Sequence, residues 1–206
     1  MKKQINNQKR ILSTILTTLL ATLLLAVLPT EAEAEIYGDT LRLHILANSD
    51  SEEDQELKLK IRDKLLIKYG AILKEKASFE EAEEYAELLL PKIEEDVELW
   101  ISELGYSYKA SVTLSEEWYD TREYEDFTLP SGYYNSLQII IGDGDGKNWW
   151  CVMYPPLCMD IATEKAPSDD GVIDYTSEEL TLIKSGKYNI KFKILEVVSS
   201  IFAKNG

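Results

Sequence analysis

The sequence predicts an α+β domain in which two long helices pack on a mainly antiparallel sheet that includes a glycine-rich hairpin. Two segments carry apolar residues at helical spacing, and several shorter segments carry them at every second position or as short continuous runs. A glycine-rich stretch separates two of these shorter segments, as in a hairpin. No internal repeat is evident.

The N-terminal segment has the layout of a secretory signal. Four basic residues come first, namely Lys2, Lys3, Lys9 and Arg10. The apolar stretch Ile11–Leu28 follows, and Pro29 ends it. Small side chains at Ala32 and Ala34 suit a signal peptidase, so we expect cleavage after Ala34 and a signal peptide of residues 1–34. An uncleaved anchor is the alternative, because about 18 apolar residues just span a bilayer.

The remaining chain is expected to form one domain, and it is acidic. Residues 35–206 number 172, which suits a single domain with a normal core. They carry 18 basic and 35 acidic residues, a net charge of −17. Such a surface repels phosphate, so nucleic acid is not expected as a partner. The charge favours solubility or a basic partner surface.

The first predicted elements are a strand and a long helix. Leu41–Leu46 is a short apolar run, which predicts a buried strand. Residues 48–51 are all good N-cap residues, and apolar residues then recur at helical spacing to about Lys74.

The second helix is predicted from Ser78 to Leu104. Glu81 completes a capping box with Ser78, and Gly105 ends the apolar stripe. Pro91 lies inside the pattern, so the helix is either kinked there or divided into two.

The predicted strands follow the helices. Tyr106–Leu114 alternates with a period of two, and Tyr133–Ile141 repeats this behaviour. Residues 142–147 are rich in glycine, and Trp149–Tyr154 is expected to return as the second strand of a hairpin. A short helix is expected near Ser177–Ser185.

The sequence frames no catalytic or metal-binding group. His44 is the one histidine of the chain, and it lies in an apolar strand without a nucleophile motif, which favours a structural role. A hydrolase that uses His44 with Ser49 or Ser51, or a pair of carboxylates, is the alternative. The glycine-rich tip has Lys147 where a calcium loop needs its third ligand. We therefore expect no catalytic residue, no metal site, no cofactor and no small-molecule substrate.

The segment 148–158 combines large aromatic side chains with two prolines. Trp149 and Trp150 face opposite ways on a strand, so that one fills the core while the other reaches outward. An exposed aromatic on a rigid segment is typical of interface hot spots, although a role in the core alone is the alternative. The contact candidates in this segment are Trp149, Trp150, Tyr154, Pro155 and Pro156.

The chain has two cysteines, Cys151 and Cys158. In an exported protein such a pair can oxidise, and its spacing suits two adjacent strands if the Cα atoms come within about 6 Å. A metal site is disfavoured because neither a C-x-x-C nor an H-x-x-x-H pair occurs. A disulfide between the two is therefore a candidate, and free thiols are the open alternative.

Two stretches resemble the signatures of one known family. Residues 44–63 contain H-x-x-A-N-S-D-x-x-x-D-Q-x-L-K-x-x-x-R-D, and residues 148–158 contain N-W-W-C-V-x-x-P-P-L-C. Both resemble signatures of stage II sporulation protein R. Residues 129–134 also resemble the L-P-x-G-x-Y turn of that family, so the likeness covers roughly residues 41–160.

The resemblance implies a signalling protein that the forespore exports into the space between the forespore and the mother cell. Such proteins trigger a membrane-embedded aspartic protease of the mother-cell membrane, which then processes the sigma-E precursor. The implied partner is a protein. The strand-to-helix turn supplies a second set of contact candidates, namely His44, Asn48, Asp50, Asp54 and Arg62. Their alternative is structural, because Asn48 and Asp50 can cap the helix and Arg62 can pair with Asp63.

Overall fold

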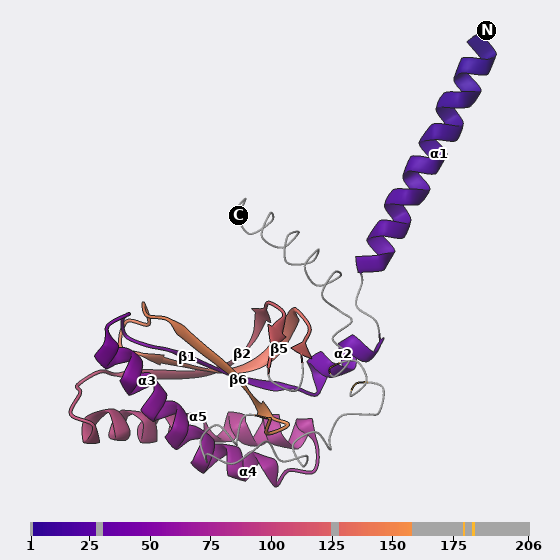
Figure 1. The fold of residues 1–206 in the computed structure, drawn as a ribbon. Coiled ribbons are helices and arrows are strands. Elements are labelled where there is room, and N and C mark those ends of the chain that lie inside the picture. The colour runs from indigo at the N-terminus through magenta and orange to yellow at the C-terminus, as the bar shows by residue number, and fades with distance from the viewer. Residues whose placement is uncertain (1, 28–30, 125–127, 158–178, 180–182, 184–206) are drawn as a thin grey trace.

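The computed structural model describes residues 2–27, 31–124, 128–157, 179 and 183. Its centre is a four-stranded mixed sheet with the strand order β2-β5-β1-β6. The strands are β1 (Leu41–Leu46), β2 (Ala110–Tyr119), β5 (Gly132–Ile141) and β6 (Asn148–Tyr154). β1 pairs parallel with β5 and antiparallel with β6, and β2 pairs antiparallel with β5 (Figure 1). The predicted α+β class with a mainly antiparallel sheet is confirmed.

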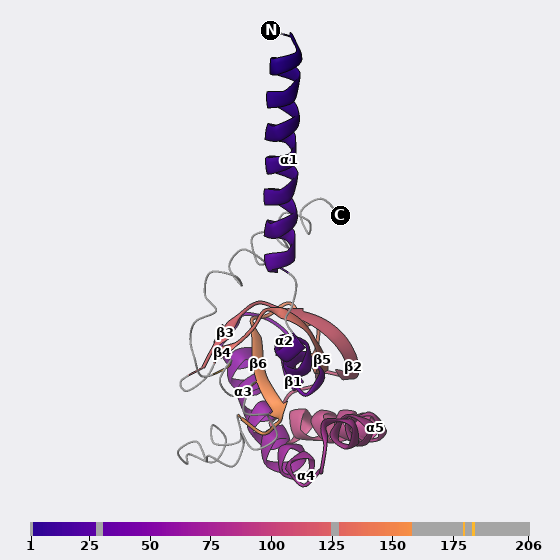
Figure 2. The same cartoon turned by 90° about the vertical axis from the view of Figure 1, so that its right-hand side faces the viewer.

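The helices that cover the sheet directly follow β1 along the chain. They are α3 (Glu52–Leu65), a π-helical turn η1 (Leu66–Gly70), α4 (Ala71–Lys74) and α5 (Phe79–Glu103). Figures 1 and 2 show these helices together on one face of the sheet. The structure gives α5 as one helix with Pro91 inside it, so the division into two helices does not occur.

The ends of both long helical segments follow from their sequence. The side chain of Ser51 accepts a hydrogen bond from the N–H of Asp54 at the start of α3, and Ser78 does the same for the N–H of Glu81 at the start of α5. Glu81 also accepts from the N–H of Ala77, which extends the capping box. Both predicted N-termini are therefore confirmed.

The core lies between the sheet and these helices. Leu43 and Ile45 of β1 and Leu137 and Ile139 of β5 are fully buried, as expected for alternate residues of a half-buried sheet. The helices contribute buried residues at helical spacing, which include Leu57, Ile61, Leu65, Val97 and Ile101. Each such Leu or Ile stabilises the fold by roughly 2 to 3 kcal/mol through burial of apolar area.

Two helices and a small sheet complete the described chain. α1 (Lys2–Val27) and α2 (Glu31–Gly38) precede β1, while β3 (Arg122–Glu123) pairs with β4 (Thr128–Leu129). Among the described residues, no helix combines the length and apolar character needed to cross a membrane. The expected cleavage point after Ala34 lies within α2, and Ile36 just beyond it is buried in the core.

Two strand predictions need correction. The predicted hairpin is wrong, because β1 lies between β5 and β6 and residues 142–147 join strands that are not neighbours. Alternation in sequence marks strands but does not decide which strands pair. The strand predicted from Tyr106 begins only at Ala110 and continues to Tyr119. Of the helix predicted near Ser177–Ser185, residues 179 and 183 are described and helical, and the rest lies outside the described residues.

Candidate functional site

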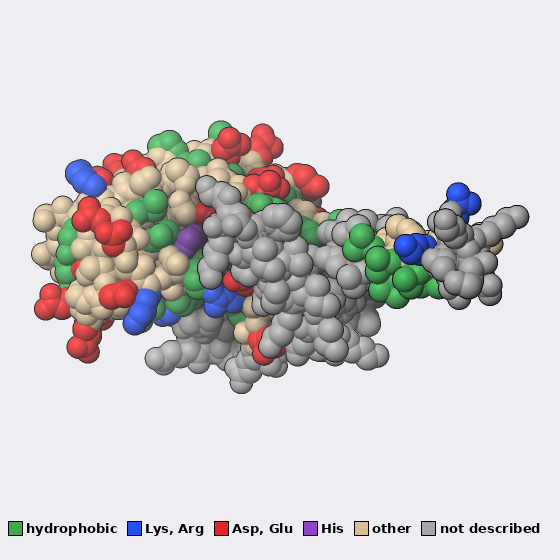
Figure 3. Space-filling view, turned by 90° about the horizontal axis from the view of Figure 1, so that it is seen from above, with side chains coloured by type: hydrophobic (Ala, Val, Ile, Leu, Met, Phe, Trp, Pro, Cys, Tyr) green, Lys and Arg blue, Asp and Glu red, His purple; other side chains and the backbone are tan. Residues whose placement is uncertain are grey.

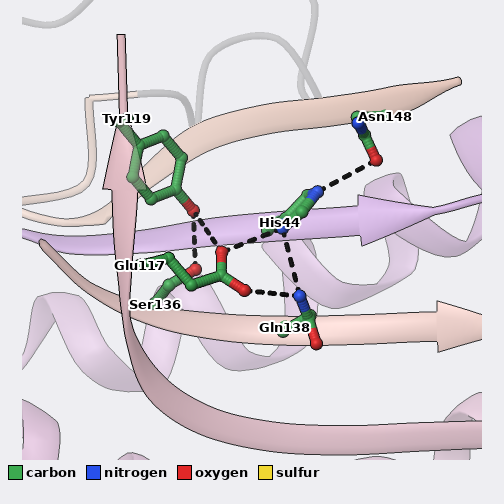
Figure 4. Close-up of polar contacts among 6 residues, drawn as sticks. All are labelled: His44, Glu117, Tyr119, Ser136, Gln138 and Asn148. Atoms are coloured by element: carbon green, nitrogen blue, oxygen red, sulfur yellow. Dashed lines mark hydrogen bonds and ion pairs between the residues drawn. The ribbon is translucent and has the colours of Figure 1, made fainter. Parts of the chain in front are cut away.

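The face of the sheet opposite the long helices carries a cluster of polar side chains. Since Leu43 and Ile45 point toward the helices, the residue between them, His44, points to the other face. The same alternation brings side chains from all four strands of the sheet to this face (Figure 4). The cluster consists of His44, Glu117, Tyr119, Ser136, Gln138 and Asn148. We call it the His44 cluster.

His44 is held on both edges of its ring. Its Nδ1 lies 2.9 Å from Oε2 of Glu117, and its Nε2 lies 3.0 Å from Oδ1 of Asn148. Gln138 donates from Nε2 to the other carboxylate oxygen of Glu117. The ring also stacks on Trp150, with centroids 5.4 Å apart and planes at 26°. Polar contacts and an aromatic contact therefore fix the imidazole in one orientation.

Glu117 is the acid at the centre of the cluster. The Tyr119 hydroxyl lies 3.3 Å from Oε2 of Glu117 and 2.6 Å from Oγ of Ser136. Burial raises the pKa of Glu117, but the hydrogen bond and charge of His44, with the Ser136 and Tyr119 hydroxyls, bring this pKa below its ordinary value. Burial raises the pKa of Tyr119, which keeps its hydroxyl protonated as a donor. The arrangement favours an ionised Glu117.

Trp149 and Trp150 face opposite sides of the sheet, as the alternation predicts. Trp150 is stacked between the His44 ring and the guanidinium of Arg122, whose Cζ lies 3.9 Å from the ring centroid. Trp149 lies toward α3, where Cζ of Arg62 is 5.0 Å from its ring centroid. Both tryptophans are half-buried. Trp150 therefore belongs to the same surface as His44, while Trp149 does not.

Arg42 is a buried cation beside the His44 cluster. Its side chain is fully buried, with Cζ 3.9 Å from the Tyr119 ring centroid and 5.0 Å from that of Tyr134. Its Nη2 donates to the hydroxyl of Tyr124 at 2.9 Å. Tyrosine faces thus replace water around the charge. This residue supports the tyrosine that holds Glu117.

The turn after β1 is organised around Asp54. Asn48 Nδ2 and Ser49 Oγ donate to Oδ2 of Asp54, at 2.9 and 2.6 Å, and Ser51 Oγ accepts from its backbone N–H. Burial raises the pKa of Asp54, but hydrogen bonds from Ser49, Asn48, Tyr108 and Ser51 bring it below the ordinary value. Asp54 is buried, so its carboxylate braces the turn.

The same turn holds the glycine-rich loop against the end of β1. Asn48 Oδ1 accepts from the N–H of Asp143 at 3.0 Å, and Asp50 Oδ1 accepts from the N–H of Lys147 at 2.7 Å. The loop must come close, because a Cβ built on Gly142 would lie 2.2 Å from Oδ1 of Asn48. The side chains of Asn48 and Asp50 therefore bond to the backbone of this loop and help to order it.

The remaining candidate site residues differ in burial and in their contacts. Tyr154, Pro155 and Pro156 are buried, which removes them from the exposed surface despite their aromatic and rigid character. Arg62 pairs with its neighbour Asp63 at 2.7 Å, which is its structural alternative. His44 does not meet a serine of the turn, because the turn hydroxyls bond to the turn itself.

Cys151 is disulfide-bonded and fully buried. Cys158, the other cysteine of the sequence, lies outside the described residues, so its pairing with Cys151 stays a prediction. Within the part of the chain that is described, no group of three or more His, Cys, Asp or Glu is placed to hold a metal ion.

Sequence reasoning missed Glu117, Gln138 and Arg42. Glu117 and Gln138 lie 73 and 94 positions from His44, so no local spacing connects them. The signal for Arg42 was present, since an arginine two positions before His44 in the same apolar strand has to share its face.

The fold and the His44 cluster define a class of protein. It is an α+β protein in which polar side chains brace one face of the sheet and the turn after β1. A model of a known family, "Stage II sporulation protein R (spore_II_R)", matches residues 37–164. That is more than half of the chain, and the chain therefore belongs to the stage II sporulation protein R family. The name of that family refers to a stage of sporulation.

One curated relative supports this assignment. Stage II sporulation protein R of Bacillus subtilis (strain 168) is 39% identical over 118 residues, which are 57% of this chain and 53% of the relative. The chain thus spans about half the length of that relative. No solved structure matches the chain.

Proposed function

We propose that this protein is an exported signal of sporulation that binds and activates a membrane-embedded aspartic protease of the mother-cell membrane. Activation would lead to proteolytic processing of the sigma-E precursor. Membership of the family supports the sporulation role. The observation that carries the non-catalytic mode of action is the fixation of His44 by Glu117, Asn148 and Trp150.

A histidine that works as a general base must present a ring nitrogen to a substrate or nucleophile. In this protein Nδ1 faces a carboxylate, Nε2 faces an amide oxygen, and the ring face lies on an indole. Each contact stabilises the present orientation of the ring. The geometry supports a structural role in which His44 joins β1 to β2 and β6.

Export is part of the proposal and is supported by the N-terminal sequence. Basic residues precede the apolar stretch, and small residues follow it, as in secretory signals. The chain as a whole carries a net charge of −15, which suits a basic partner surface better than nucleic acid. The proposed place of action is the space between the forespore and mother-cell membranes.

The contact surface that we favour includes Trp150 and Arg122. Figure 3 shows that the face of the His44 cluster carries the single histidine among acidic and apolar side chains. Trp150 is half-buried beside it, and Arg122 lies on its ring. Tryptophan and arginine are among the residue types that contribute most to the binding energy of protein interfaces.

Reconstitution of the purified chain with the candidate protease and the sigma precursor tests the proposal. Both the full chain and residues 35–206 are expected to stimulate cleavage of the precursor. His44→Gln should keep much of this stimulation, whereas Trp150→Ala should weaken the interaction by about 2 kcal/mol. Absence of stimulation by the correctly folded chain would reject the proposed activity.

An exported hydrolase is the second candidate, and one contact favours it. The Glu117–His44 pair joins a carboxylate to an imidazole at 2.9 Å, as in catalytic triads. Under this alternative His44→Gln and Glu117→Gln should each abolish turnover while circular dichroism stays unchanged. Retained stimulation of the protease by His44→Gln excludes a catalytic His44 from the signalling activity.

A further inference from the structure

β2 is an edge strand whose first half is protected by α5. Among the described strands its one neighbour in the sheet is β5, and Figure 2 shows β2 at the edge. The N–H groups of Ala110 and Val112 point away from β5. They donate to the carboxylates of Glu98 at 3.4 Å and Glu94 at 3.2 Å. Residues of α5 therefore replace a neighbouring strand along this half.

No described strand or helix pairs with the second half of the β2 edge. In an antiparallel pair, alternate residues direct their backbone groups outward, so Leu114, Glu116 and Trp118 continue the series of Val112. Within the described part of the chain, no hydrogen bond reaches the outward N–H groups of these residues. Glu116 is exposed and Trp118 is 38% exposed, so solvent has access to them. Open edges of this kind pair with extended chains.

An exposed aromatic pair lies beside the open edge. Trp118 of β2 is directly opposite Tyr133 of β5, and their rings meet edge to face with centroids 5.2 Å apart. Tyr133 is 58% exposed. Both side chains lie on the same face as Leu114, by the alternation of β2. Backbone hydrogen bonds and an apolar anchor are thus available at one place.

The charge of the edge selects its occupant. Glu116 is exposed between Leu114 and Trp118 on the same face. The residue of an added strand that lies opposite Glu116 is favoured when it is Lys or Arg, and its neighbours two positions away are favoured when they are apolar. A second copy of this chain, paired about a twofold axis at Glu116, would bring two carboxylates together, which is unfavourable.

We propose that the β2 edge from Leu114 to Trp118 binds an extended segment of a partner protein as an added β-strand. That segment carries a basic residue with apolar residues two positions before and after it. The identification of this partner as the activated protease rests on the proposed function. The binding mode is independent of that function, because it follows from the exposed backbone groups and side chains of the β2 edge.

The probe is a capped nine-residue peptide. A central Lys has Val two positions before and two positions after it, and Thr occupies the other positions. Titrated into the isotope-labelled full chain, it should give saturable shifts of the backbone amides of Leu114, Glu116 and Trp118. Glu116→Pro removes an outward N–H and leaves the pairing with β5 intact, so it should weaken binding about tenfold or more. Glu116→Gln keeps that N–H and should lose affinity only at low salt.

Three results would overturn the proposal. The first is no saturable shift up to about 1 mM peptide. The second is equal affinity of the folded Glu116→Pro variant. The third result applies if that variant does not fold. It is undiminished binding of a probe in which the backbone amides that face β2 are N-methylated and so cannot donate hydrogen bonds. None of these readouts involves the protease, so a failed activation assay and a failed edge are separate results.

Discussion

Replacing Asp96 by Asn is expected to destabilise the fold by about 2 kcal/mol at neutral pH. The Asp96 side chain of α5 is buried and accepts hydrogen bonds from Lys68, Tyr69 and Lys92. Burial raises the pKa of Asp96, but these donors and the charge of Lys68 outweigh it and lower the pKa from 3.8 to about 2. A difference of this size corresponds to roughly 2 kcal/mol of preference for the ionised form.

The sign of the pH dependence follows from the lowered pKa. The stabilisation by Asp96 is fully present above about pH 4 and is lost as the pH falls to about 2. Urea unfolding followed by circular dichroism at pH 7 and at steps down to pH 2 measures this difference. The variant and the natural chain should differ most at pH 7 and converge at the acid end.

Glu95→Gln is the matched control for Asp96. Glu95 is the adjacent residue on α5, pairs with the same Lys92 at 2.7 Å, and is 71% exposed. Loss of the Glu95 charge should lower the free energy of unfolding by no more than about 0.5 kcal/mol, because water screens an exposed ion pair. Equal effects of the two substitutions at pH 7, or an Asp96→Asn effect that persists unchanged at pH 2, would refute the reasoning.

Two further predictions concern the site. Gly142→Ala should cost about 2 kcal/mol, because its φ of 61° is left-handed and the new Cβ would lie 2.2 Å from Asn48. Gly105→Ala is the control, because its φ is 89° and a new Cβ would have no atom within 4 Å; it should cost about 1 kcal/mol. Equal losses of unfolding free energy in urea for the two variants would contradict the close contact of Gly142 with Asn48. Glu117→Gln should be less stable at neutral pH, and this deficit should shrink as the pH falls below about 4.5, since the pKa of Glu117 is lowered beside His44. An unfolding difference that is constant with pH would exclude an ionised Glu117.

The predicted contact surface and the structure differ because burial depends on the whole chain. The sequence grouped Trp149, Trp150 and Tyr154 as one aromatic segment. Alternation sends Trp149 toward α3 and Trp150 toward His44, and Tyr154 is buried at the end of β6. Trp150 therefore remains a candidate on the exposed side of the sheet, and Trp118 with Tyr133 adds a second aromatic surface that sequence reasoning did not select.

The sequence by itself determined the local elements of this protein. The spacing of apolar residues placed β1, α3 and α5, and the caps at Ser51 and Ser78 set where the two helices begin. It also indicated the family through two ordered motifs. These signals are local, because helix and strand periods and capping bonds involve residues a few positions apart.

The tertiary structure decided which strands are neighbours and what surrounds His44. β1 is inserted between β5 and β6, which removes the predicted hairpin and places Glu117 and Asn148 on either side of the histidine. Periodicity records which face of a strand is buried, but not which edge it meets. That choice depends on the packing of all strands and helices at once, and its contacts join residues that are far apart in the chain.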